Sequence, residues 1–195
     1  MVTANTIVES LATSCRQFDA VPDDVTYATV MLDSAGEHSN VSLPIVEFVV
    51  DDITRVTSRN TEKTGVVVDD TGAEVGYNYT QWFDLTVTAL VQTVPQTSTT
   101  HRELAQLVRR SLYRHDSHGP SQSLPDPDNI GSTLSGVSYV AVGDAAPSHD
   151  FGMSPSLRAR SITLDIKFEH SWSSADLGVE YEQVEAIDPI NIVVE

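Results

Sequence analysis

The fold of this chain is decided by residues 75–91, VGYNYTQWFDLTVTALV. In the later part of this stretch apolar side chains stand at every second position: Phe83, Leu85, Val87, Ala89 and Val91. Alternation with a period of two is typical of a strand that buries one face. We therefore expect a long strand over residues 82–94, which Pro95 ends because proline donates no backbone N–H. The earlier part, 75–79, is expected to form a hairpin with residues 66–68 across a glycine-containing turn.

Amphipathic helices are predicted on both sides of this strand region. Thr100 and Glu103 have the spacing of a capping box, in which each side chain bonds the backbone N–H of the other residue. A helix is therefore predicted over residues 100–115. The sequence TIVE that begins at Thr6 has the same spacing, so a first helix is predicted over residues 6–18.

Further strands are predicted on either side of these elements. Residues 160–172 show the cleanest alternation in the chain. The apolar side chains of this segment take one face: Ile162, Leu164, Ile166, Phe168 and Trp172. Shorter strands are predicted at 27–32, 41–50 and 138–142. Pro44 interrupts the second of these, which therefore lies at an edge of the sheet or begins after the proline.

The remaining segments are polar. Residues 51–65 are interpreted as a loop or a short irregular strand. Residues 116–136 are rich in Pro, Gly, Ser and Asp and are predicted to form a long loop. Residues 173–195 form an acidic C-terminal extension, in which 190–194 is a candidate last strand. We therefore expect residues 1–195 to form a single α+β domain, an antiparallel β-sheet with helices packed on one face.

The charge of the chain indicates the solvent in which it works. It carries 28 Asp and Glu against 11 Lys and Arg, a formal net charge of -17. Such a surface repels itself at low salt, whereas molar salt shortens the Debye length to roughly 3 Å and screens the repulsion. We interpret the acid excess as that of a halophilic protein, and an ordinary acidic mesophile protein is the alternative. The same charge argues against nucleic acid or an anionic membrane as the main partner.

Motifs of catalysis, cofactor binding and metal binding are missing from the sequence. It contains neither Gly-x-Ser-x-Gly nor Gly-x-Gly-x-x-Gly. Cys15 is the single cysteine and is expected to be buried on the first helix, and the Asp69-Asp70 pair is expected in a hairpin turn. The other His and Asp clusters match no metal-ligand spacing: His115, Asp116, His118, His149 and Asp150. We therefore predict no enzymatic activity, no cofactor and no metal.

Four arginines are candidates for contacts between subunits: Arg55, Arg59, Arg158 and Arg160. They form two local positive spots in an acidic chain. One interpretation is that they make salt bridges within the chain. The other is that they meet carboxylates of a neighbouring subunit, because the planar guanidinium group is favoured at interfaces.

The order of the predicted elements resembles that of the tail-terminator proteins of long-tailed viruses. The resemblance is carried by residues 75–91 followed by the helix at 100–115, and it covers residues 5–115 and 138–172. Proteins of that family are small α+β proteins that form a hexameric ring, which caps the completed tail tube and joins it to the head. The resemblance implies a structural virion protein of the viral neck, assembled in the host cytoplasm. The acid excess points to a tailed virus of a haloarchaeon.

The resemblance also implies the partners. These are five further copies in a hexamer, the tail tube protein, and the connector or portal-proximal proteins of the head. DNA is expected to pass through the lumen without specific binding, and no membrane is involved. Two alternatives remain open. One is a head-completion or connector protein of the neck, and the other is a halophilic cytoplasmic enzyme or ligand-binding domain, which needs a pocket with converging polar groups.

Overall fold

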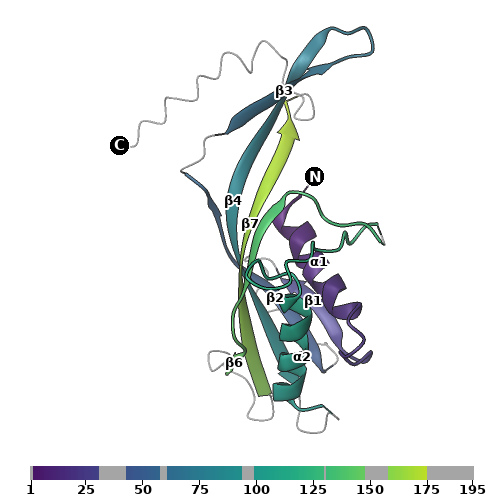
Figure 1. Ribbon diagram of the computed structural model, residues 1–195, viewed down its shortest axis with the longest axis vertical. Helices are drawn as coiled ribbons and strands as arrows, with labels where there is room; N and C mark the ends of the chain where they lie inside the picture. The colour runs from purple at the N-terminus through teal and green to yellow at the C-terminus, as the bar shows by residue number, and fades with distance from the viewer. Residues whose placement is uncertain are drawn as a thin grey trace.

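The computed structural model describes residues 2–30, 43–57, 61–93, 99–129, 131–147 and 158–174, with only the backbone of Val30 and Arg158. Within these ranges a mixed sheet of seven strands carries two helices on one face, so the fold is α+β (Figure 1). The helices are α1 (Ala4–Arg16) and α2 (His101–Tyr113). The strands are β1 (Thr26–Val30), β2 (Ile45–Arg55), β3 (Glu62–Val68), β4 (Glu74–Thr93), β5 (Val137–Val142), β6 (Ala146–Pro147) and β7 (Arg158–Ser173).

The sheet is built around β4 and β7. β4 has 20 residues and β7 has 16, and the two pair antiparallel from Asn78 opposite Ser173 to Thr93 opposite Arg158. The predicted hairpin strand at 75–79 and the predicted long strand at 82–94 are therefore one continuous strand. Around this pair the strand order is β1-β2-β4-β7-β5, while β3 pairs with β4 and β6 pairs with β7.

One pairing differs from the expected antiparallel sheet. β1 runs parallel to β2, from Thr26 opposite Ile45 to Val30 opposite Val49. Parallel neighbours need a connection of about a dozen residues or more, and residues 31–44 provide that length. The predicted strand at 27–32 is confirmed through Val30, and its last two residues lie outside the described residues.

The hydrophobic core lies between the two helices and the sheet. On α2, Leu104, Val108 and Leu112 are fully buried and form the predicted stripe. The predicted inward faces of β4 and β7 are buried with them: Leu85, Val87, Ala89, Val91, Ile162, Leu164, Ile166 and Phe168. Cys15 of α1 is fully buried, as expected, and desolvation raises the pKa of its thiol to about 12.

The two helix starts had the same signature in the sequence but differ in the structure. At α2 the capping box is present, with Thr100 accepting from the backbone of Glu103 and Glu103 accepting from the backbone of Thr100. At α1 the predicted box is wrong. Thr3 is the N-cap and accepts from the backbone N–H of Thr6, so the helix begins at Ala4 and Thr6 lies inside its first turn. Thr3 carries the same hydroxyl three residues earlier. Its backbone is extended, which is the conformation of an N-cap residue.

Of the two interpretations of residues 51–65, a loop or a short irregular strand, the loop is wrong for most of the described part. β2 continues to Arg55 and β3 begins at Glu62. By contrast, the described residues of the predicted loop 116–136 contain no helix or strand and only one bridge, between Pro125 and Thr133. The extension after Ser174, including the candidate strand 190–194, lies outside the described residues.

The molecule has two regions that share the same strands. The body is the part in which α1 and α2 cover one face of the sheet. The arm is the part that rises beyond the helices: residues 51–55 of β2, all of β3, residues 74–84 of β4 and residues 168–173 of β7 (Figure 1). Both regions have a helix-side face, because the strands run continuously from one region into the other.

Candidate functional site

The helix-side face of the arm can be assigned from the strand register. Leu85 points into the core, and directly opposed residues of antiparallel strands share a face. Ile53 is opposite Leu85 and Arg55 is opposite Phe83, so both lie on the helix-side face. The same pairing and alternation place eleven residues there: Ile53, Arg55, Lys63, Val66, Tyr77, Tyr79, Gln81, Phe83, Phe168, His170 and Trp172.

Rings from β4 and β7 form an aromatic ladder on this face. Its members are Tyr77, Tyr79, Phe83, Phe168, His170 and Trp172. Phe83 stacks on Phe168 with centroids 5.5 Å apart, and Tyr79 stacks on Trp172 at 5.8 Å. His170 links the two pairs, since it lies 5.8 Å from Trp172 and 6.4 Å from Phe83. The ladder begins at the core, where Phe168 is buried, and continues the core upward past the helices.

Along β2 the residues change from buried to exposed at Asp51. Its residues from Ile45 to Val50 are buried or half-buried, whereas all five from Asp51 to Arg55 are exposed. On the helix-side face Ile53 is 39% exposed and Val66 is 44% exposed, while Val68, which is opposite Glu74, is 56% exposed on the back face. Three of the four large exposed hydrophobic side chains among the described residues are therefore in the arm. Ile53 and Val66 lie at the two ends of the helix-side face with half-buried aromatic rings between them, and an apolar surface of this kind marks an interaction site more often than scattered exposed residues do.

The two faces of the arm carry opposite charge. Among the cross-strand pairs that the structure describes in the arm, the charged residues on the helix-side face are Arg55 and Lys63, with no carboxylate. The opposite face, which we call the back face, carries five carboxylates in the arm, Asp52, Glu62, Glu74, Asp84 and Glu169, and Lys167 lies opposite Asp84 at its lower end. Lys167 is bridged to Asp84 at 3.2 Å. In a chain with a net charge of -17, the helix-side face of the arm is a cationic, aromatic exception.

Local contacts hold the polar groups of the helix-side face in place. The Lys63 ammonium group lies over the Tyr77 ring. The Arg55 guanidinium donates to the Thr61 hydroxyl at 3.1 Å, and this hydroxyl donates to the Gln81 side chain at 2.7 Å. These contacts reduce the side-chain freedom that a partner must restrict on binding.

The predicted arginines are not brought together. Arg55 pairs with Phe83 and Arg160 with Val91, so eight residues of β4 separate them, about 26 Å at 3.3 Å per residue. Arg59 lies outside the described residues, and only the backbone of Arg158 is described. Contact of these arginines with a neighbouring subunit stays a prediction. Arg55 is the better placed of the two described side chains, because it is exposed.

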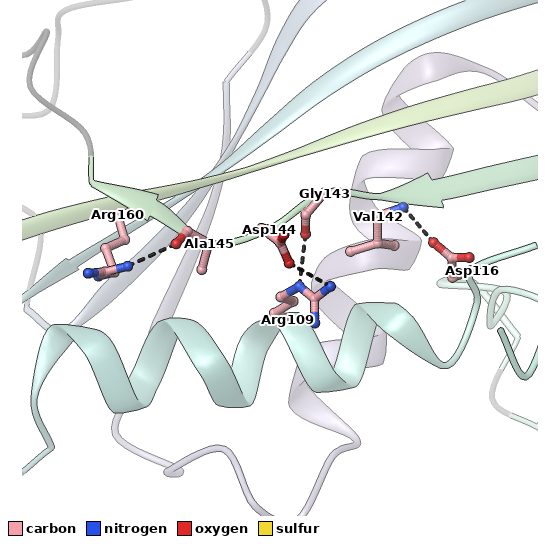
Figure 2. A network of polar contacts seen from close by, with 7 residues as sticks. All are labelled: Arg109, Asp116, Val142, Gly143, Asp144, Ala145 and Arg160. Carbon is pink, nitrogen blue, oxygen red and sulfur yellow. Dashed lines mark hydrogen bonds and ion pairs between the residues drawn. The ribbon is translucent and has the colours of Figure 1, made fainter. Parts of the chain in front are cut away.

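Arg160 takes part in a network within the body. Its guanidinium donates to the Ala145 carbonyl at 2.8 Å. From the other side, Arg109 of α2 donates to the Gly143 carbonyl at 2.9 Å and pairs with Asp144 at 2.9 Å. Figure 2 shows that both arginines reach the segment between β5 and β6 from different elements. Arg160 therefore has a partner within the chain, but that partner is a backbone carbonyl and not the carboxylate of the predicted salt bridge.

A Ser–His pair lies between the helices. The Ser14 hydroxyl is 2.6 Å from His115 Nε2, and His115 Nδ1 is 2.9 Å from the Gln122 carbonyl. Burial lowers the pKa of His115, so the ring is neutral, and Nδ1–H donating to Gln122 leaves Nε2 to accept from Ser14. Ser14 is 2% exposed and His115 is 4% exposed. We interpret the pair as a buried cross-link between α1, α2 and the following loop.

The other sequence candidates have structural partners. Asp116 accepts from the backbone of Val142 at 2.7 Å and of His118 at 2.8 Å, and so anchors the loop to β5 (Figure 2). Asp69 lies in the hairpin turn, as expected, where hydrogen bonds led by the Thr71 hydroxyl lower its pKa. His149 and Asp150 lie outside the described residues. Over the described ranges, no group of three or more His, Cys, Asp or Glu side chains is arranged to hold a metal ion.

No model of a known protein family matches this chain, and no curated protein sequence matches it. In the part of the chain that the structure describes, neither helix is long and apolar enough to cross a membrane. The helix-side face of the arm is therefore the candidate functional site on geometry alone. The alternation along the strands predicted this face, but no pattern in the sequence indicates how far the helices extend over it.

Proposed function

We propose that this chain is a structural subunit of a tailed virus, a tail terminator that forms a hexameric ring at the head–tail junction. In this role it caps the tail tube and joins it to the head. The observation that carries the proposal is the arm, whose aromatic helix-side face continues the core and leaves Ile53 and Val66 exposed and the rings of Tyr79, Phe83 and Trp172 half-buried. A structural subunit acts by shape and association, and a partly exposed extension of the core provides a surface for association.

The outer edge of β3 supports association between subunits. β3 pairs with β4 alone among the described strands, so its second edge presents unpaired N–H and C=O groups. An edge of this kind accepts a strand from another chain by extending the sheet. The exposed Val66 and Val68 side chains lie on the same strand, so apolar contact and backbone pairing are available together.

The positive charge of the helix-side face favours a head-to-tail contact with an acidic part of another copy. Such a contact joins two different surfaces, and repeated contacts of this kind close into a ring when the rotation allows. Six copies of a -17 subunit also repel one another. Molar salt screens this repulsion, while the aromatic contact does not depend on charge. Assembly is therefore expected in molar salt and not in dilute buffer.

The acid excess also suits a ring through which DNA passes. Phosphate binding requires clustered Lys and Arg, and a predominantly acidic subunit offers the polymer no such surface. The ring is proposed to contact the tail tube protein on one side and the head connector on the other. It would belong to the virion neck after assembly in the host cytoplasm.

The test of the role is binding of the assembled ring to viral parts. Purified rings in molar potassium chloride are mixed with tail tubes and, separately, with portal-bearing heads from the same virus, and both are imaged by electron microscopy. Rings on tube ends are the expected result. Rings that bind only the heads would replace the terminator role with that of a connector, and rings that bind neither would contradict both neck roles.

A further inference from the structure

We propose that the helix-side face of the arm receives the acidic C-terminal segment, residues 175–195, of a neighbouring copy of this chain. This inference rests on the proposed self-assembly and names the contact that holds adjacent subunits together. It is carried by three features: the chemistry of the face, the chemistry of the segment, and the place where the segment leaves the sheet.

The face has the size and chemistry to bind an extended peptide. From Leu85 to Tyr77 it runs along eight residues of β4, about 26 Å at 3.3 Å per residue. Aromatic rings form its floor, and Ile53 and Val66 are exposed along the neighbouring strands. Two cations flank this floor, Arg55 at its lower end and Lys63 near its upper end. A ligand that fits the face is therefore extended, partly apolar and negatively charged.

The C-terminal segment has this composition. Residues 175–195 read ADLGVEYEQVEAIDPINIVVE and contain neither Lys nor Arg. Six carboxylates are spread along the segment: Asp176, Glu180, Glu182, Glu185, Asp188 and Glu195. Leu177, Val179 and Tyr181 alternate with a glycine and glutamates, the pattern of a peptide that turns apolar side chains to one side and carboxylates to the other. Apolar side chains would pack on the ladder while carboxylates reach Arg55 and Lys63.

The exit point of the segment favours a neighbour over the same copy. β7 runs from the body into the arm, and Ser174 is tied to Tyr77 by hydrogen bonds of 3.0 and 2.8 Å at the upper end of the ladder. A chain that continues in this direction leaves its own ladder behind and would have to reverse to cover it. Fully extended, the segment reaches about 70 Å at 3.3 Å per residue, which is enough to lie along the arm of an adjacent copy.

A second cationic surface is less suited to this role. The outer side of α2 carries Arg102 and Arg110, but two other arginines of the same region already have partners in the chain. Arg109 pairs with Asp144, and Arg114 donates to Gln122 at 3.1 Å. The outer side of α2 therefore serves as a matched control surface, since Arg110 is exposed and far in the sequence from the arm.

Site-directed cross-linking between two full-length copies tests the contact. One copy carries Tyr181→Cys and an affinity tag, and the other carries Val66→Cys on the helix-side face. The native Cys15 does not interfere, because it is fully buried and its thiol pKa is raised to about 12. The copies are mixed in dilute buffer, assembled in molar salt and treated with a short bismaleimide. The control copy carries Ser171→Cys, which is exposed on the back face of the arm.

A tagged heterodimer that forms several-fold more with Val66→Cys than with Ser171→Cys is the expected result. Adding Arg55→Glu to the Val66→Cys copy should reduce the yield several-fold, whereas adding Arg110→Glu should leave it unchanged. Equal yields from both faces, or none, in rings that still assemble would overturn the inference but not the ring. A double variant with Val66→Cys and Tyr181→Cys can also be diluted with wild-type copies. Cross-links only within one chain would then show that the segment binds the arm of its own copy, and would contradict the contact with a neighbour. Failure of the wild-type chain to assemble would overturn the proposed function itself.

Discussion

The body and the arm are built from the same strands, yet only one of them is a closed structure. In the body, Leu85 and its neighbours on the helix-side face are covered by α1 and α2. In the arm the same face continues with Tyr79, Phe83 and Trp172, which are half-buried, with Tyr79 stacked on Trp172 and Phe83 stacked on Phe168. The alternation along β4 does not change at the boundary. What changes is the burial of the side chains on the helix-side face. A strand can therefore bury its apolar side chains against helices in one half and present them to a partner in the other.

The comparison predicts that removing a side chain lowers the free energy of unfolding more in the body than in the arm. Phe48→Ala removes a fully buried ring of β2 and should lower the free energy of unfolding by about 3–5 kcal/mol, through lost burial and the cavity left behind. Urea unfolding of the variant in molar salt measures this loss. Val66→Ala, a truncation in the arm, is the control. A loss for Phe48→Ala no larger than for Val66→Ala would show that the two regions do not differ in this way.

A second prediction concerns the polar anchoring of the body. Asp116→Ala leaves the buried backbone N–H of Val142 without its acceptor and should cost about 1–3 kcal/mol. The matched control is Asp128→Ala in the same loop, where the side chain is exposed. The measurement is urea unfolding in molar salt. Equal, small losses for both variants would mean that Asp116 does not anchor the loop to β5.

A third prediction is a pH dependence that belongs to the body. Burial lowers the pKa of His115 below the ordinary 6.5, with the nearby Arg114 acting in the same direction. Below pH 6.5 the unfolded chain therefore binds a proton that the folded chain does not, so the free energy of unfolding should fall as the pH falls, with no contribution above 6.5. His115→Gln should flatten this dependence and the exposed His118→Gln should not. A pH profile unchanged by His115→Gln would contradict the buried neutral ring.

The smallest expected effect on stability is in the arm. Val66→Asp changes a side chain that is 44% exposed, so the free energy of unfolding of the unassembled chain should change by no more than about 0.5 kcal/mol. Urea unfolding in dilute buffer, where assembly is not expected, measures this value. A loss of the size predicted for Phe48→Ala would show that the face is covered within the single chain.

The body was largely predictable from the sequence because its signals are local. The alternation at 160–172 and the capping box at Thr100 each report a buried face or a helix start, and both are confirmed. The start of α1 was missed because Thr3 and Thr6 are both good N-caps and only the structure shows which hydroxyl is used. The parallel pairing of β1 with β2 joins distant segments, and no local pattern encodes it.

The arm was harder to predict for a physical reason. Alternation identifies a strand when one of its faces is buried, but residues 51–55 are all exposed and no residue of β3 is fully buried. Their polar residues therefore looked like a loop. The aromatic residues that form the ladder were visible in the sequence, and Trp172 was placed on the correct face. That this face is only partly buried beyond the body follows from the three-dimensional structure and not from a local pattern.

The central claim is that the partly exposed helix-side face of the arm joins the subunits, and light scattering in molar potassium chloride tests it most directly. The wild-type chain and the back-face variant Ser171→Asp should form a species with a mass near six times 21.2 kDa. Val66→Asp should remain at 21.2 kDa under the same conditions, because a carboxylate then stands on the apolar face. A wild-type mass of 21.2 kDa at every concentration, or a ring formed equally well by Val66→Asp, would contradict the claim.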